Sequence, residues 1–333
     1  IHIDNDLFWN PIHVDGQSYG GYATASYGKY KTWLWSNTAQ ADYRFGELHS
    51  ASLLVGNEQQ RRTSEAFGIN RQTLSDPAFD LVQAGFTTNN STGMAKGENY
   101  LLSSFGRLTY DFGKKYFLSG NIRQDEYSAL GKKKGIFWGA SAGWDLTQES
   151  FWEGTALDNI FNAFRLRGSY GKVGNIGGIG NYESYSTYGT SLYGGNPTLA
   201  LGPNVTTSNI GNPLLTWETS IKTDVGLTFG VLNDRISGEI AYFKNDINNL
   251  ILNVTQAPST GLGTIPSNVG TMYNKGVEIT LNASPVQGKA FNWSSSFNFT
   301  TVKNEVTSLA PGLNEIAYST TDLELTNKTL VGY

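Results

Sequence analysis

Apolar and polar side chains alternate along residues 217–229 of the chain. Successive side chains of a β-strand point to opposite faces of a sheet, so the pattern predicts a strand with one apolar and one polar face. Strands in soluble proteins usually have about 5–6 residues, whereas a tilted strand that crosses a bilayer needs about 9–11. The run therefore favours a membrane-spanning strand. We expect lipid contact from Trp217, Ile221, Val225, Leu227 and Phe229, and a lumenal position for Glu218, Lys222 and Asp224.

Similar alternating runs recur along the chain and predict about eleven or twelve strands. The clearest are 21–30, 33–45, a run from residue 49, 100–112, 116–123, 136–146, 164–170, 217–229, 236–242, 250–254, 277–283 and 291–299. Residues 1–20 and the last 30 or so show little periodicity.

The predicted connections alternate in length. Short ones lie near residues 46, 114, 232 and 287, with a medium one near 155; longer ones lie at 59–97, 124–134, 174–212, 253–270 and from 303 onward. Short periplasmic turns and long extracellular loops are typical of an outer-membrane barrel, and aromatic residues near strand ends fit a membrane interface. A soluble sandwich or solenoid is the less favoured alternative. The predicted fold is thus all-β, an antiparallel transmembrane β-barrel.

The composition excludes several other classes. The chain has no cysteine and only three scattered histidines, so we expect neither a metal site nor a cofactor. No Ser-His-Asp order, HExxH, phosphate-binding glycine loop or CxxC motif is found, which argues against an enzyme. The formal net charge of −4 argues against a nucleic-acid partner. No run of apolar residues is long enough to cross a bilayer as a helix.

Several short motifs add a family resemblance. Residues 165–171 read Arg-Leu-Arg-Gly-Ser-Tyr-Gly, followed by Gly-Asn at 174–175; Asn-Pro at 212–213 precedes Trp-Glu at 217–218; and residues 274–278 read Asn-Lys-Gly-Val-Glu. In this order, the motifs resemble the SusC/RagA-type TonB-dependent outer-membrane transporters. The resemblance implies a barrel of about 22 strands around an N-terminal plug.

The chain departs from that family pattern. It carries no plug domain and no motif like a TonB box, so residues 1–333 correspond to a portion of the barrel domain. A half barrel would leave unpaired strand edges in lipid, where each unsatisfied backbone group costs several kcal/mol. We therefore expect the native protein to be longer than this chain, or several chains to complete the barrel.

Five charged residues are candidates for the lumen wall: Arg165, Arg167, Glu218, Lys222 and Asp224. The acidic residues and the lysine either form a charge-balanced pore wall or contact substrate. The arginines either pair with carboxylates of the wall or plug, or guide anions through the lumen.

The connection at 174–212 carries a cluster of tyrosines among Gly, Ser and Asn: Tyr182, Tyr185, Tyr188 and Tyr193. Aromatic rings stack on sugars or peptide side chains and are frequent in interfaces. We interpret the four as candidate ligand or partner contacts, with packing between loops as the alternative. The lysines at 132–134 would contact lipopolysaccharide phosphates if they lie outside the cell, or form an ordinary solvated loop.

The leading functional hypothesis is TonB-dependent import of a bulky nutrient, an oligosaccharide or a peptide, at the bacterial outer membrane. The resemblance implies a SusD-like surface lipoprotein as a lid, and coupling to the TonB complex through an N-terminal part that this chain lacks. A passive porin or a structural barrel subunit is the alternative.

Overall fold

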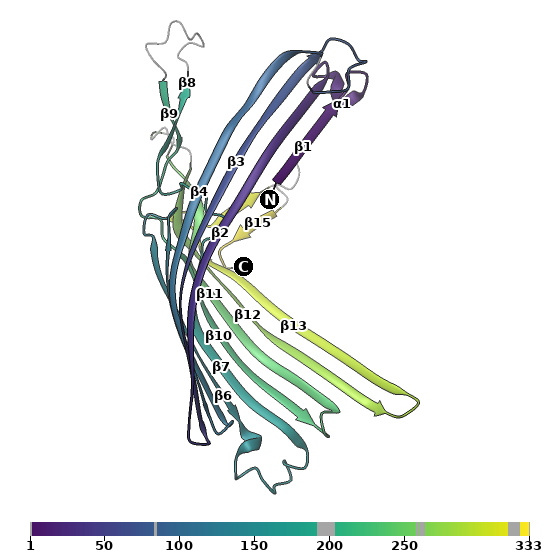
Figure 1. Ribbon diagram of the computed structural model, residues 1–333, viewed down its shortest axis with the longest axis vertical. Helices are drawn as coiled ribbons and strands as arrows, with labels where there is room; N and C mark the ends of the chain where they lie inside the picture. The colour runs from purple at the N-terminus through teal and green to yellow at the C-terminus, as the bar shows by residue number, and fades with distance from the viewer. Residues whose placement is uncertain are drawn as a thin grey trace. The chain divides into compact units, whose positions relative to one another are not determined.

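The computed structural model describes residues 2–82, 85–191, 204–257, 259, 264–318 and 327–332, with side chains described except at 2–6, 90–93, 188–191, 204–209 and 317–318. Eleven strands form one sheet in the order β1-β2-β3-β4-β5-β6-β7-β10-β11-β12-β13. Every described register between neighbours in it is antiparallel. Two further pairs, β8-β9 and β14-β15, form small separate sheets. The predicted all-β, antiparallel fold is confirmed (Figure 1).

The strands are β1 (His2–Trp9), β2 (Tyr22–Phe45), β3 (His49–Leu74), β4 (Phe86–Phe112), β5 (Tyr116–Tyr127), β6 (Lys134–Asp145), β7 (Phe161–Asn175), β8 (Thr187–Ser191), β9 (Asn204–Asn209), β10 (Glu218–Val231), β11 (Ile236–Thr255), β12 (Thr264–Gln287), β13 (Asn292–Ser308), β14 (Glu315–Tyr318) and β15 (Asn327–Leu330). The helices are α1 (Val14–Gln17) and a 3-10 turn, η1 (Leu146–Gln148). Within the described residues, no helix has the length and apolar character to cross a membrane.

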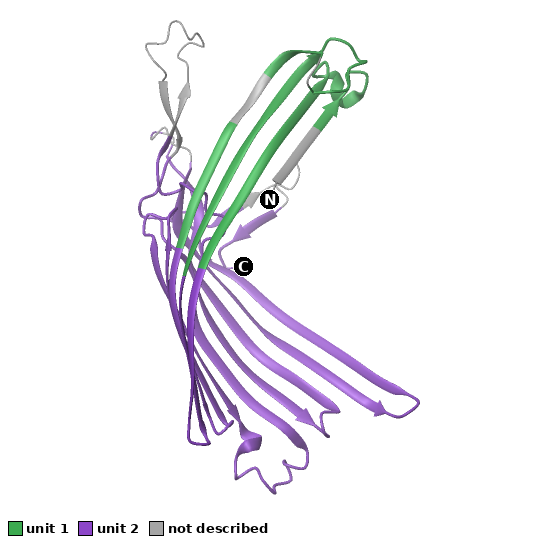
Figure 2. Cartoon of the chain, in the orientation of Figure 1, with its two compact units in different colours: residues 1–35, 58–101 green, residues 36–57, 102–333 purple. Residues whose placement is uncertain are grey.

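The chain divides into two compact units (Figure 2). Unit 1 holds residues 1–35 and 58–101, and unit 2 holds residues 36–57 and 102–333. Unit 1 has a small apolar core of Ala23, Leu74 and Phe86, against which Phe8 and Val82 pack. The rings of Phe8 and Phe86 meet edge to face at 6.0 Å.

The prediction of a long loop at residues 59–97 is wrong. β3 continues to Leu74 and β4 begins at Phe86, so only a short connection separates them. These strands have 26 and 27 residues, well beyond the about 9–11 that cross a bilayer. Residues 57–65 of β3 are polar at odd and even positions alike, so neither face is apolar there and the period-two pattern is absent.

Other predicted boundaries also change. The runs at 21–30 and 33–45 form the single strand β2, and the loop predicted at 253–270 is largely strand, since β11 ends at Thr255 and β12 begins at Thr264. Residues 1–20 contain β1 and α1, and the C-terminal region contains β14 and β15. The short turns predicted near 46, 114, 232 and 287 are all present between consecutive strands.

Unit 2 has one apolar and one polar face. Val225 of β10 pairs with Tyr242 of β11, which pairs with Val277 of β12. In the next row, Leu227 pairs with Ile240, which pairs with Ile279. Directly paired residues share a face, so the apolar positions line up across the strands. Val225 is 54% exposed although it is apolar. The exposed side chains of this face include Leu118, Ile122, Trp138, Leu166, Tyr170, Val225, Ile240, Tyr242, Phe297 and Phe299.

Trp217 departs from the predicted lipid-facing set. It precedes the first residue of β10 and is only 5% exposed. Its ring packs edge to face on Phe137 at 5.1 Å, and its indole N–H donates to the Lys133 carbonyl at 2.8 Å. The prediction for Trp217 is therefore wrong. Alternation predicts the face of a residue only within a strand, and Trp217 lies just before β10, where the β5–β6 connection packs over its ring.

The connection between β6 and β7 folds against the ends of the neighbouring strands. The Glu149 carboxylate accepts hydrogen bonds from the Tyr116 hydroxyl at 2.5 Å and from the Trp144 indole at 3.0 Å, and Lys115 Nζ lies 3.5 Å away. The hydrogen bond from Tyr116, then that from Trp144, lowers the pKa of Glu149, and partial desolvation opposes the shift.

A charged residue on the exposed apolar face should be costly. We expect Val225→Arg to lower the free energy of unfolding by about 2–4 kcal/mol, the penalty for arginine near the middle of a bilayer. The measurement is urea unfolding in lipid vesicles. Lys222→Arg, on the opposite face of the same strand, is the matched control and should change little; equal losses in both variants would contradict the assignment of faces.

Acid should loosen the β6–β7 connection. A carboxyl with a lowered pKa in the folded state stabilises the fold above its ordinary pKa, about 4.5, and loses this contribution as pH falls through the lower folded value. Tryptophan fluorescence should therefore report a transition below about pH 4.5 that Glu149→Gln removes. A transition unchanged in Glu149→Gln would assign it to another group.

Candidate functional site

A row of small polar residues crosses the face of unit 2 opposite to the apolar one. Ser119 of β5 lies opposite Ser141 of β6, which lies opposite Ser169 of β7, which in turn lies opposite Asp224 of β10. The Ser119 and Ser141 hydroxyls hydrogen-bond at 2.8 Å. Because paired residues share a face, antiparallel register alone aligns three hydroxyls and a carboxylate that are distant in the sequence.

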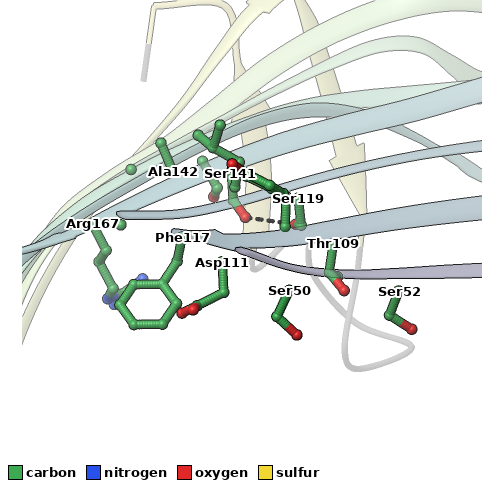
Figure 3. Close-up of a pocket in the computed structure, with 14 residues that line it drawn as sticks. Ser50, Ser52, Thr109, Asp111, Phe117, Ser119, Ser141, Ala142 and Arg167 are labelled. Carbon is green, nitrogen blue, oxygen red and sulfur yellow. Dashed lines mark hydrogen bonds between the residues drawn. The ribbon is translucent and has the colours of Figure 1, made fainter. Parts of the chain in front are cut away.

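This row borders a hollow of about 520 Å³ (Figure 3). Figure 3 shows Ser50, Ser52, Thr109 and Asp111 among the residues that line it, and Phe117 and Arg167 also belong to the lining. The hollow thus combines hydroxyls, a carboxylate, a guanidinium and one aromatic ring. These groups can hydrogen-bond and stack on a polar ligand or chain segment.

Sequence reasoning did not single out most of these residues. The signal was available, because Thr109 and Asp111 alternate with Leu108, Tyr110 and Phe112. Period two assigns them to the polar face. What the sequence lacks is the pairing of β3, β4 and β5, which brings them beside the serine row.

Arg167 connects two neighbouring strands. Its guanidinium donates to Asp224 of β10, and its Nε donates to Glu239 of β11 at 3.1 Å. Gly226 is the residue paired with Arg167, and a Cβ at this glycine would lie 3.0 Å from Nε. The glycine therefore leaves the space that the arginine needs to extend across β10.

Arg165 is paired in a similar way. Its Nη2 lies 2.9 Å from an Asp145 carboxylate oxygen, and its guanidinium lies 5.0 Å from the centre of the Phe117 ring. Both predicted arginines thus contact carboxylates of the wall itself, as the first of the two interpretations expects. Glu218 accepts a hydrogen bond from Asn175 at 2.9 Å, and Lys222 is exposed on the same face.

The structure divides the four predicted tyrosines. Tyr182 and Tyr185 are 45% and 50% exposed in the connection after β7. Tyr188 belongs to β8, but its side chain is not described, and Tyr193 lies outside the described residues. The connection is not structureless, because β8 and β9 pair within it. Its root is fixed where Asn212 N–H donates to the Glu183 carbonyl at 3.0 Å.

Hydrogen bonds join the roots of three connections at the end of the sheet opposite to the short turns. Lys132 N–H donates to the Leu215 carbonyl at 2.9 Å, and Asn268 exchanges two hydrogen bonds with the Thr216 backbone at 2.8 and 2.9 Å. Asn212 donates to the Pro266 carbonyl at 2.8 Å. A Cβ at Gly131 would lie 1.9 Å from the Pro213 carbonyl oxygen, so this contact requires glycine.

No group of three or more His, Cys, Asp or Glu is placed to hold a metal ion in the described parts of the chain. A sheet with one exposed apolar face and one polar face defines the class: this is the wall of an outer-membrane β-barrel.

The chain belongs to the TonB dependent receptor-like, beta-barrel family, whose profile matches residues 2–331. It is 32% identical over 306 residues to TonB-dependent receptor P26 of Formosa agariphila, covering 87% of this chain and 29% of that protein. It is 29% identical over 274 residues to TonB-dependent receptor SusC of Bacteroides thetaiotaomicron, covering 78% of this chain and 26% of that protein. The predicted SusC/RagA-type resemblance and the outer-membrane location are confirmed.

A solved structure has a similar fold. The structure of the RagAB peptide transporter matches with a TM-score of 0.80 and 26% identity, over 94% of this chain and 34% of that chain. This chain therefore spans about a third or less of the length of the relatives it matches.

Loss of the Arg167 cation should destabilise the sheet through the carboxylates it leaves unpaired. The ion pairs of Arg167 with Asp224 and Glu239 are partly exposed. We therefore expect Arg167→Met to lower the free energy of unfolding by about 1 kcal/mol in a complete transporter that contains this chain. Arg167→Met combined with Asp224→Asn and Glu239→Gln should recover most of this loss, because no unpaired charge remains.

The measurement is the urea midpoint in lipid vesicles, with Arg235→Met in the β10–β11 turn as the control. A triple variant no more stable than the single one would show that the loss comes from packing of the arginine stem rather than from charge.

Proposed function

We propose that this chain forms part of the barrel wall of an importer that takes up a bulky nutrient, an oligosaccharide or a peptide, with energy supplied through TonB. The observation that carries the proposal is the polar face with its hydroxyl-lined hollow, on a sheet whose other face is apolar. A polar ligand needs such a surface along its path, and lipid contact needs the opposite one.

The five charged candidates support a wall that is close to charge-balanced on the polar face. Arg165 and Arg167 contact Asp145, Asp224 and Glu239 within the sheet. A wall whose arginines are already paired favours neutral or zwitterionic cargo over a small anion. Both oligosaccharides and peptides meet this condition, and the RagAB peptide transporter has a similar fold.

In this proposal the short turns near 46, 114, 232 and 287 face the periplasm. The connection at 174–212 faces outward, together with the lysines at 132–134, which would contact lipopolysaccharide phosphates. A SusD-like lipoprotein lies over the outward connections, and the TonB complex acts on an N-terminal plug supplied by the complete protein. The hydrogen-bonded roots at 128–133 and 211–217 support this arrangement, because a lid needs a fixed seat.

The proposal predicts uptake that depends on TonB. Cells carrying the complete gene should take up labelled maltooligosaccharides or oligopeptides, and deletion of TonB should reduce uptake to background. A passive porin, the competing function, would still admit small solutes without TonB. Uptake of either probe that persists in the TonB deletion would reject energised import.

A second prediction concerns the exposed tyrosines. Tyr182→Ser with Tyr185→Ser should weaken co-purification of the lipoprotein lid, because half-exposed rings are the kind of side chain that interfaces bury. Leu214→Ser is the control, since Leu214 is an exposed apolar residue of the same connection. Unchanged lid recovery in the tyrosine variant would leave the tyrosines as loop-packing residues.

A further inference from the structure

A continuous line of aromatic rings follows the short-turn end of unit 2. Consecutive ring centres along it are 4.8, 4.9, 6.1, 6.3 and 6.4 Å apart. The rings belong, in order, to Phe45, His49, Phe112, Tyr116, Trp144 and Phe151. Aromatic rings at strand ends mark the level of the membrane interface. The last ring, Phe151, no longer belongs to a strand but to the connection between β6 and β7.

That connection, residues 146–160, lies on the apolar side of the sheet. Tyr116 pairs with Trp144, and Trp144 pairs with Leu166, so all three belong to the apolar face. Glu149 is hydrogen-bonded to the first two. The connection is thus attached to the side of the wall that faces lipid, and not to the polar side with the hollow.

A second aromatic contact holds the same connection in place. The Trp152 ring packs on Phe161 at 6.3 Å and on Phe164 at 5.4 Å. Phe164 pairs with Phe229 and Phe161 with Val231, which are apolar-face positions of β10. Trp152 is buried in these contacts and therefore holds the connection against β7.

Three large apolar side chains of the connection are exposed. Phe151, Leu157 and Ile160 are 59%, 46% and 47% exposed. Leu232, an exposed residue of the next turn, donates its N–H to the Ile160 carbonyl at 3.2 Å and extends the apolar surface. Residues 146–160 contain Glu149, Glu153 and Asp158 but no lysine or arginine.

We propose that residues 146–160, together with Leu232, form a lobe that inserts into the phospholipid leaflet at the short-turn end of the barrel. Phe151, Leu157 and Ile160 lie at the boundary between headgroups and acyl chains, as apolar residues of an interfacial segment do. The occupant is lipid because the lobe continues the aromatic line and is attached to the apolar face. Its acidic residues match a zwitterionic headgroup bearing an ammonium group better than an anionic one.

The test uses a complete transporter that contains this chain, reconstituted in nanodiscs of phosphatidylethanolamine and phosphatidylcholine. These 333 residues contain no cysteine, so single Phe151→Cys, Leu157→Cys and Ile160→Cys variants can be labelled with a fluorescent probe once any cysteine elsewhere is replaced. Glu47→Cys, an exposed position in the β2–β3 turn, is the matched control. A change in gel mobility between unheated and heated samples confirms that each barrel is folded.

We expect lipids that carry a doxyl group near the headgroup to quench the three lobe probes several-fold more than the control probe. Aqueous iodide should show the reverse order. Replacing the zwitterionic lipids by phosphatidylglycerol should reduce the doxyl quenching, and equal quenching would reject the headgroup preference. Lobe probes quenched by iodide as strongly as the control would place the lobe in water. Probes protected from both quenchers would place it against protein, and either result overturns the proposal.

Discussion

The bilayer leaves a spanning chain no water with which to satisfy its backbone N–H and C=O groups, so every strand must hydrogen-bond to neighbouring strands. The ladder from β1 to β13 is the consequence, and the side chains follow from it. A paired, extended backbone must direct alternate residues to opposite faces, one of which meets lipid. Val225 and Asp224 are adjacent in the sequence and lie on opposite faces for this reason, the first exposed on the apolar face and the second bonded to Arg167.

The same constraint explains what the sequence could predict. Within the membrane, lipid on one side produces the period-two pattern. The pairing of β10 with β11, and of β11 with β12, puts the apolar residues from Ile221 to Phe229 on one face, as the pattern predicts. Outside the membrane, both faces of a strand meet water and no pattern is required. The extensions of β3 and β4 were therefore mistaken for a loop, although they are hydrogen-bonded strands.

The candidate site shows the limit of sequence reasoning more sharply. Alternation correctly assigns Arg165, Arg167, Lys222 and Asp224 to one face, because it needs only the local strand period. The hollow depends on which strands are neighbours and in what register, so Ser50, Thr109 and Phe117 could not be grouped beforehand. Trp217 fails for a related reason: its burial against Phe137 depends on the connection that folds over it, which no local pattern encodes.

The connections at the two ends have different roles. At one end, a backbone hydrogen bond joins Lys132 to Leu215, and the Asn268 side chain bonds the Thr216 backbone, so the roots of these connections are fixed. At the other end, the β6–β7 connection is fixed by Glu149 and Trp152 against the apolar face and exposes Phe151, Leu157 and Ile160. The wall between them combines an apolar face, a polar face and paired charges in one sheet.

The central claim is that alternate residues of one strand face lipid and water. It is tested most directly by a cysteine scan of residues 219–230 in β10 of a complete, reconstituted transporter. Labels at 221, 223, 225, 227 and 229 should be quenched by doxyl lipids, and labels at 222, 224 and 228 should react with a water-soluble maleimide, giving a period of two. Uniform aqueous reactivity along the strand, or a period other than two, would contradict the account.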